Sequence, residues 1–273
     1  MTGEQVVPLK HHWTWVASAA AVCVAGIVLY SVSTNQAFQW PVVARYMLDS
    51  EILAGLARTL ELTVAAMAIG LVLGTVLALM RLSSNLLLST LSWLYIWFFR
   101  SVPVLVQLIF WYNFGALYPA ITLRAPFGSV LYHASMNAVI TPLTAALAGL
   151  GLAQAAYTAE VIRAGIQSVP LGQTRAAKAL GMLPGTIFFR IVFPQAMRVI
   201  IPPVGNEVIS MVKNTSLVSV IALAELLYTA QLIYARTYQT IPLLIVASLW
   251  YLIVVSFLSV GQHFLERHYR QRT

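Results

Sequence analysis

The chain has 273 residues, of which 60% are hydrophobic and only 9% are charged. Soluble domains carry about 25% charged residues, so this composition excludes an ordinary water-soluble fold and predicts a chain solvated by lipid. The net charge of +8 does not imply a nucleic-acid partner, because the basic residues of membrane proteins gather in cytoplasmic loops.

Six apolar stretches are long enough to cross a bilayer, since a spanning helix needs about 20 residues. The first, 13–32, carries no charge, and its length and two tryptophans favour a retained helix over a cleaved signal peptide. The third is interrupted by Arg100 and Pro103, and its first part, 86–99, could instead lie along the membrane interface. We therefore expect an all-α integral membrane protein with about six transmembrane helices. The other five stretches are 62–80, 86–118, 138–166, 191–211 and 241–261.

A further apolar segment, 215–235, could form a seventh crossing, but the basic residues argue against it. With six crossings and the N-terminus inside, most basic residues fall on one face, as the positive-inside rule requires. A seventh crossing would place the basic tail, 263–273, outside. We therefore predict that 215–235 is a helix on the outer face, or partly re-entrant from it, and that both termini are cytoplasmic.

The sequence carries no recognisable catalytic motif. Its five histidines are not at metal-ligand spacing, and its single cysteine, Cys23, offers no disulfide. The patterns H-E-x-x-H, G-x-S-x-G and the nucleotide-binding G-x-x-x-x-G-K-[ST] do not occur. The chain is therefore expected to be no enzyme, with no metal and no cofactor of its own.

Two acidic residues lie near arginines within the apolar stretches. Glu61 follows Arg58 by three residues, and Arg163 follows Glu160 by the same spacing. Residues three apart lie on one helical face, so each acid can pair with its arginine. Such residues mark either a transport pathway or self-neutralising pairs at helix ends, and the two interpretations weigh about equally.

A polar stripe marks the fifth stretch. Asn206, Ser210 and Asn214 recur every four residues, after two consecutive prolines at which a regular helix is expected to break. Broken helices occur in membranes where they line a cavity or are buried in protein, so the stripe favours a pathway over packing. Arg100 and Gln107, seven residues apart, would share one face of the third span. The candidate pathway residues are Glu61, Arg100, Gln107, Glu160, Arg163, Asn206, Glu207, Ser210, Lys213 and Asn214.

The loop between the fourth and fifth spans, 167–194, predicts a short cytoplasmic helix. A Pro-Leu-Gly turn at 170–172 precedes a segment, 173–180, whose three alanines favour helix. Gly181 is suited to end that helix. By these features alone, the segment is either a simple connection along the interface or a docking element.

This loop resembles the cytoplasmic signature loop of ABC-importer permeases. The family pattern is E-A-A, three residues, G, nine residues and then I-x-L-P. Matching residues are Ala176, Ala177, Gly181, Ile191 and Pro194, with Phe193 in place of leucine. Segments 99–107, 156–170 and 213–217 resemble further motifs of the polar amino acid subfamily, so that the resemblance covers about residues 55–262.

The resemblance implies a type I importer permease fold in the bacterial inner membrane. The permease core would be 55–262, preceded at 1–54 by an N-terminal tail, an accessory helix and a periplasmic linker, and followed by the tail 263–273. Two separate ABC ATPase subunits would bind ATP and Mg. A second permease subunit, identical or homologous, would complete the pathway, and a periplasmic or lipid-anchored solute-binding protein would deliver a polar amino acid.

The resemblance also implies which residues couple the chain to its ATPase. They are Gly172, Arg175, Ala176, Ala177, Lys178, Gly181, Ile191 and Pro194. Arg175 departs from the family pattern, which has glutamate there, so the partner groove is expected to be less basic or more acidic at that point. The alternative from another class is a stand-alone secondary transporter or channel, which inverted repeats would favour.

Overall fold

The structure, a computed structural model, describes residues 12–124 and 130–270. Within these residues, five helices are long and apolar enough to cross a membrane, and a bent pair of shorter helices makes a possible sixth span. This agrees with the expectation of about six transmembrane helices. The basic residues at 1–11 and 271–273, on which the topology argument drew, lie outside the described part.

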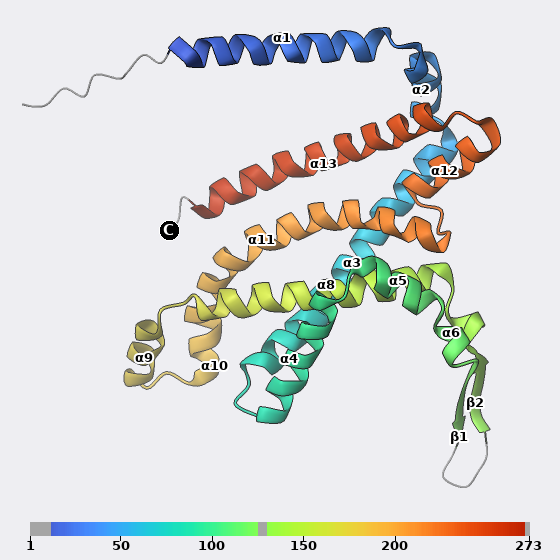
Figure 1. Ribbon diagram of the computed structural model, residues 1–273. Helices are drawn as coiled ribbons and strands as arrows, with labels where there is room; N and C mark the ends of the chain where they lie inside the picture. The colour runs from blue at the N-terminus through green and yellow to red at the C-terminus, as the bar shows by residue number, and fades with distance from the viewer. Residues whose placement is uncertain (1–11, 125–129, 271–273) are drawn as a thin grey trace, which may run out of the picture.

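The first helix, α1 (His12–Thr34), stands apart from the bundle (Figure 1) and is exposed from residue 13 to residue 31. Because its side chains are almost all apolar, the exposed surface suits lipid rather than water. A short 3-10 turn, η1 (Gln36–Phe38), leads to α2 (Trp40–Met47), which packs against α13.

The centre of the bundle is the close pair α3 (Ser50–Leu82) and α8 (Pro142–Gln167). Glycines on α3 let the two backbones approach, as is common between membrane helices. A Cβ built on Gly74 would lie only 2.9 Å from the Thr158 Cβ of α8. The apolar pattern predicted that α3 starts near residue 62, but the helix begins at Ser50, where Asp49 accepts a hydrogen bond from the Glu51 amide. The predicted core boundary at residues 54 and 55 therefore falls inside α3.

The third apolar stretch forms two helices, α4 (Leu86–Ser101) and α5 (Val104–Tyr112), at an angle of 100°. Pro103 lies between them, where it removes a backbone donor and favours an extended residue before it. The prediction that Arg100 and Gln107 share a helical face is therefore wrong, because the bend falls between them.

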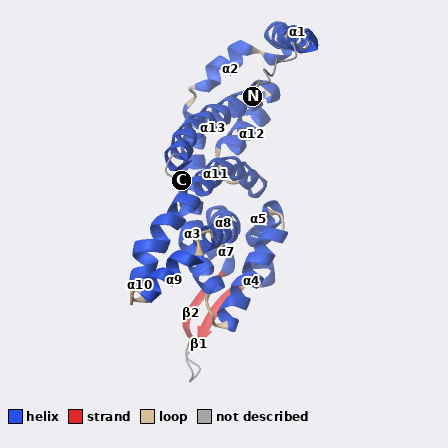
Figure 2. Ribbon diagram, turned by 90° about the vertical axis from the view of Figure 1, so that its left-hand side faces the viewer, coloured by secondary structure: helices blue, strands red, loops and turns tan. Residues whose placement is uncertain are grey.

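A β-hairpin, which the all-α prediction missed, follows α6 (Phe114–Leu117). Its strands β1 (Ala120–Arg124) and β2 (Val130–Ser135) are antiparallel, and α7 (Met136–Val139) leads on to α8. Figure 2 shows the hairpin and α1 at opposite extremes of the molecule. The strand segments are rich in β-branched and aromatic residues, a signal that is weak in so apolar a chain.

The predicted cytoplasmic helix is present as α9 (Leu171–Ala179). After it, α10 (Pro184–Ile187), the π-helical turn η2 (Phe188–Val192) and α11 (Phe193–Asn214) form a continuous run. The predicted break at the two prolines is wrong, since α11 passes through Pro202 and Pro203. Gln262 of α13 donates a hydrogen bond of 2.8 Å to the Pro202 carbonyl, so α13 supplies a donor at this point.

The chain then passes through the 3-10 segment η3 (Thr215–Ile221) to α12 (Leu226–Thr237), which is too short to span, and α13 (Thr240–Arg270). In Figure 1, α12 lies close to α2 and to the beginnings of α3 and α13. We call this part of the molecule the α12 end. We call the opposite end, where α9, α10 and the last turns of α8 and α13 lie, the loop end.

Candidate coupling loop and transport pathway

The α9 helix is short because a glycine ends it. Gly181 has a φ of +75°, a conformation that costs other residues free energy. The amide of Met182 donates back to the Ala177 carbonyl at 3.1 Å, which satisfies a carbonyl at the end of α9. Ala177, 3% exposed, packs in an apolar cluster with Val169 and Ile187. These contacts hold α9 at a defined angle to α8 and α11.

The exposed residues of α9 include small and basic side chains. Arg175, Ala176 and Lys178 are exposed, and nothing lies near a Cβ built on Gly172. Pro194 is exposed in the first turn of α11, and Ile191 is half-buried. A cavity of about 370 Å³ opens between α9 and η2, and its lining residues are Gln173, Ala176, Ala177, Leu180, Met182, Arg190, Ile191 and Gln195.

Two candidate pathway residues share one cavity on α4 and α8. Arg100 places its guanidinium 5.4 Å from the centre of the Tyr157 ring, and Glu160 lies in the same cavity of about 370 Å³. Glu160 forms the expected ion pair with Arg163 at 2.7 Å, and Arg163 also donates to Gln167. The acid here is thus neutralised on its own helix.

Glu207 turns from the other stripe residues toward α8. Its carboxylate accepts hydrogen bonds from Gln154 at 2.7 Å and from the Thr158 hydroxyl at 3.0 Å. Neither donor was singled out from the sequence, because a glutamine and a threonine in an apolar helix gain meaning only from the helix packed against them. Among the described residues, no cation pairs with Glu207.

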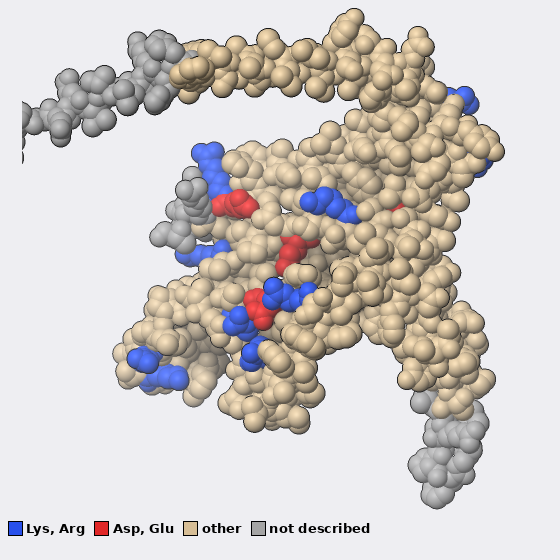
Figure 3. Space-filling model, in the orientation of Figure 1, with Lys and Arg blue, Asp and Glu red and all other residues tan. Residues whose placement is uncertain are grey.

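The remaining stripe residues of α11 stay near the surface. Asn206, Ser210 and Lys213 are exposed, and Asn214 is half-buried. Asn206 donates a hydrogen bond of 3.1 Å to Glu266 near the end of α13. Figure 3 shows acidic and basic side chains interspersed on the face that displays α4, α8 and α11, whereas much of the surface around them carries no charge.

Gln107 forms hydrogen bonds with the backbone at the bend between α4 and α5. It is 4% exposed, and its Nε2 donates to the carbonyls of Phe99 and Val102 at 3.0 and 2.8 Å. A straight helix would pair the Phe99 carbonyl with the amide of residue 103, but Pro103 has no N–H. The Gln107 carboxamide therefore substitutes for donors that the bend removes.

The predicted Glu61 pair also lies away from the other polar groups. Arg58 and Glu61 join at 2.9 Å, and their side chains are 47% and 63% exposed. The pair occupies the outward face of α3 and shares no cavity with Glu160 or Glu207 among the described residues.

Sequence reasoning missed the most buried acid of the described chain, Glu225. It is fully buried at the start of α12, where it accepts hydrogen bonds from the amides of Leu227 and Tyr228 at 3.0 and 2.8 Å. The Tyr251 hydroxyl donates at 2.8 Å, and Thr59 contributes a longer contact of 3.4 Å. An acid directly before an apolar run was the available signal, since it is typical of a helix start.

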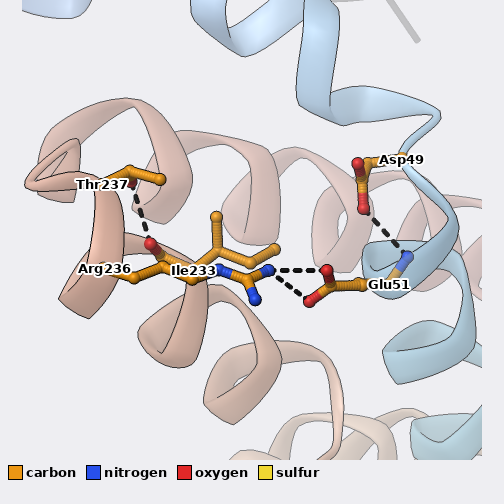
Figure 4. Close-up of polar contacts among 5 residues, drawn as sticks. All are labelled: Asp49, Glu51, Ile233, Arg236 and Thr237. Carbon is orange, nitrogen blue, oxygen red and sulfur yellow. Dashed lines mark hydrogen bonds and ion pairs between the residues drawn. The ribbon is translucent and has the colours of Figure 1, made fainter.

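A second link joins the same helices at the surface of the α12 end. Figure 4 shows Arg236 of α12 donating both hydrogen bonds to the carboxylate of Glu51, at 2.6 and 2.5 Å, while the Glu51 amide is held by Asp49. The hydrogen bond to Glu51, and then the charge of Glu51, raise the pKa of Arg236. The guanidinium therefore stays charged, although both side chains are more than half exposed.

Comparison with known proteins places this arrangement in a family. The family described as "binding-protein-dependent transport system inner membrane component" matches residues 70–271. The chain belongs to this family. It is therefore an inner-membrane permease subunit of an ABC transporter, a system that includes an ATPase and a solute-binding protein, and it is not a stand-alone transporter or channel.

Individual relatives are similar over most of the chain. The arginine transport system permease protein ArgU of Corynebacterium glutamicum is 42% identical over 268 residues, which cover 97% of this chain and 82% of ArgU. The nopaline transport system permease protein NocM of Agrobacterium fabrum is 39% identical over 81% of this chain and 90% of NocM. A solved amino acid ABC transporter, described as "with histidines", has a TM-score of 0.69 and 33% identity, over 80% of this chain and 94% of that chain.

Proposed function

We propose that this chain imports polar amino acids or opines and that α9 transmits the motion of a separate ATPase to the transport pathway. The observation that carries the proposal is the construction of α9, a short helix locked by Gly181 and by the burial of Ala177, with its other faces exposed. A rigid helix at the end of two spanning helices can move those spans as one body.

The substrate class is supported by the relatives, whose printed names include arginine, nopaline and octopine transport. Chemistry on α11 supports it as well. The Glu207 carboxylate is held by two neutral donors, so its negative charge stays available to an ammonium or guanidinium group. The candidate pathway residues include both signs, such as Glu207 and Lys213 of α11, which suits a zwitterion.

The proposed assembly has a second permease subunit opposite the exposed stripe of α11, and two ATPases at the loop end. The basic residues concentrate toward the loop end, as expected for the cytoplasmic face. We therefore propose that both termini are cytoplasmic and that the α12 end faces the binding protein.

Reconstitution of the complex with its ATPase and binding protein tests this function. Arginine should stimulate ATP hydrolysis several-fold and accumulate in proteoliposomes. Gly181→Asp should keep the permease in the membrane but uncouple hydrolysis from uptake, because it disturbs the end of α9. Wild-type coupling in Gly181→Asp would contradict the role of α9.

The pathway is tested separately with alanine at Glu160, Asn206, Glu207 and Asn214. At least one substitution should raise the KM for uptake several-fold, with the assembled complex recovered in normal amount. Normal transport by all four variants would show that the pathway lies elsewhere. Labels specific for the cytoplasmic side should reach a cysteine placed after Glu266, and the opposite result would reverse the topology.

A further inference from the structure

The loop between α8 and α11 contains basic residues and no acidic residue. Residues 161–206 contain five cations, Arg163, Arg175, Lys178, Arg190 and Arg198, and no aspartate or glutamate. Arg163 is neutralised by Glu160. Arg175 and Lys178 are exposed on α9, and no ion pair joins either of them to another described residue.

The same loop also exposes large apolar side chains. Leu171 and Leu180, at the two ends of α9, are 68% and 82% exposed, and Leu183 and Phe189 beyond it are 73% and 69% exposed. Exposed apolar groups of this size beside charged residues are typical of an interaction site, and Leu180 also lines the cavity between α9 and η2. This cavity supplies a concave surface, with Arg190 at its lining.

The shape of the surface favours a protein over a lipid headgroup layer. α8 has 26 residues, about 39 Å of helix, which exceeds the hydrocarbon thickness of about 30 Å. α9 follows its last turn and has no tryptophan or tyrosine, the residues that prefer the headgroup region. Gly172, Ala176 and Ala179 leave room on the exposed faces of α9 for another backbone to approach closely.

We infer that the ATPase subunit receives α9 in a groove whose rim is acidic, with carboxylates placed against Arg175 and Lys178. The inference rests on the proposed function, since it names the partner chemistry of the same helix. Opposite charges across such a rim set which partner is accepted and how fast it associates, and like charges exclude wrong partners. The acid-free loop thus selects a matched ATPase.

Charge reversal in the full complex tests the inference. The double variant Arg175→Glu and Lys178→Glu should reduce the ATPase retained on the purified permease about tenfold at 0.15 M salt. Retention by the unmodified permease should fall as salt rises. Arg45→Glu on α2 is the matched control, because it reverses an exposed cation at the α12 end and should leave retention unchanged.

A second charge reversal, in the ATPase, identifies the acidic residue that faces α9. Single Asp→Lys or Glu→Lys substitutions in the ATPase groove should include one that restores at least half of the retention by the double variant. The competing explanation is that α9 binds anionic lipid rather than the ATPase. Measuring retention in nanodiscs with and without anionic lipid distinguishes the two. If the loss of retention appears only with anionic lipid, α9 binds the membrane and the acidic groove is wrong.

The two proposals fail in different ways. In one outcome, charge reversal changes neither ATPase retention nor coupling, while Gly181→Asp still uncouples ATP hydrolysis from uptake. The acidic rim is then overturned and the coupling role of α9 stands. If both leave coupling unchanged, the coupling role falls too.

Discussion

The two ends of this permease treat polar groups in opposite ways. At the α12 end, the fully buried Glu225 accepts hydrogen bonds from α12 and α13, and Arg236 is paired with Glu51. At the loop end, Arg175 and Lys178 have no acid within reach along the described chain. The charged groups at the α12 end have partners within the chain, whereas Arg175 and Lys178 at the loop end are open to a partner protein.

This difference suits the mechanics of a permease. Helices that are tied together by buried hydrogen bonds move as a unit, because an unpaired buried acceptor or donor costs free energy. A docking helix needs the reverse, since charges that are already paired cannot select a partner. The contrast between the two ends predicts how stability and coupling should separate on mutation.

The largest loss of stability is expected from Glu225→Leu. The change leaves two backbone amides and the Tyr251 hydroxyl without their acceptor, which costs about 3 kcal/mol. The midpoint of thermal unfolding in detergent measures it, and Glu225→Gln should lose less because it keeps an acceptor oxygen. Glu61→Gln, an exposed acid on α3, is the control. Equal midpoints for Glu225→Leu and Glu61→Gln would remove the contrast between the two ends.

Gln107→Leu should have the next largest effect, about 2 kcal/mol, because it leaves the Phe99 and Val102 carbonyls unpaired in an apolar surrounding. Pro103→Ala restores the backbone N–H that Gln107 replaces. The double variant should therefore be more stable than Gln107→Leu alone. Thermal unfolding of the unmodified protein, the two single variants and the double variant measures the interaction energy between residues 103 and 107. Strict additivity would show that Gln107 does not compensate for Pro103.

Gly181→Ala should cost about 1 kcal/mol, since alanine disfavours the left-handed conformation. Gly185→Ala is a matched control in the same loop, because Gly185 has ordinary backbone angles and open space around it. Only Gly181→Ala should also reduce the uptake obtained per ATP hydrolysed. A similar loss in both variants would mean that the whole loop, rather than the end of α9, carries the coupling.

The smallest effect is expected from Arg236→Ala. Exposed ion pairs contribute little to stability, because water and salt screen them and holding two long side chains costs entropy. Thermal unfolding at low and high salt should show no measurable difference from the unmodified chain. A clear, salt-dependent loss would make the surface pair, rather than Glu225, the link at the α12 end.

Local sequence determined much of this protein. The apolar stretches predicted the spans, and the alanines and Gly181 predicted α9 and its end, because helix propensity and a positive φ act within a few residues. The signature spacing around Ala177 and Pro194 pointed to the correct family, because all of its residues lie within one loop of the chain.

Tertiary structure decided what depends on distant partners. Gln262 lies beside the proline pair of α11 and donates to the Pro202 carbonyl, from sixty residues away, and Thr59 and Tyr251 meet Glu225 only once three helices pack. A lone polar residue in an apolar helix has no meaning by itself, because the cost of burying it is set by the groups that the fold brings to it.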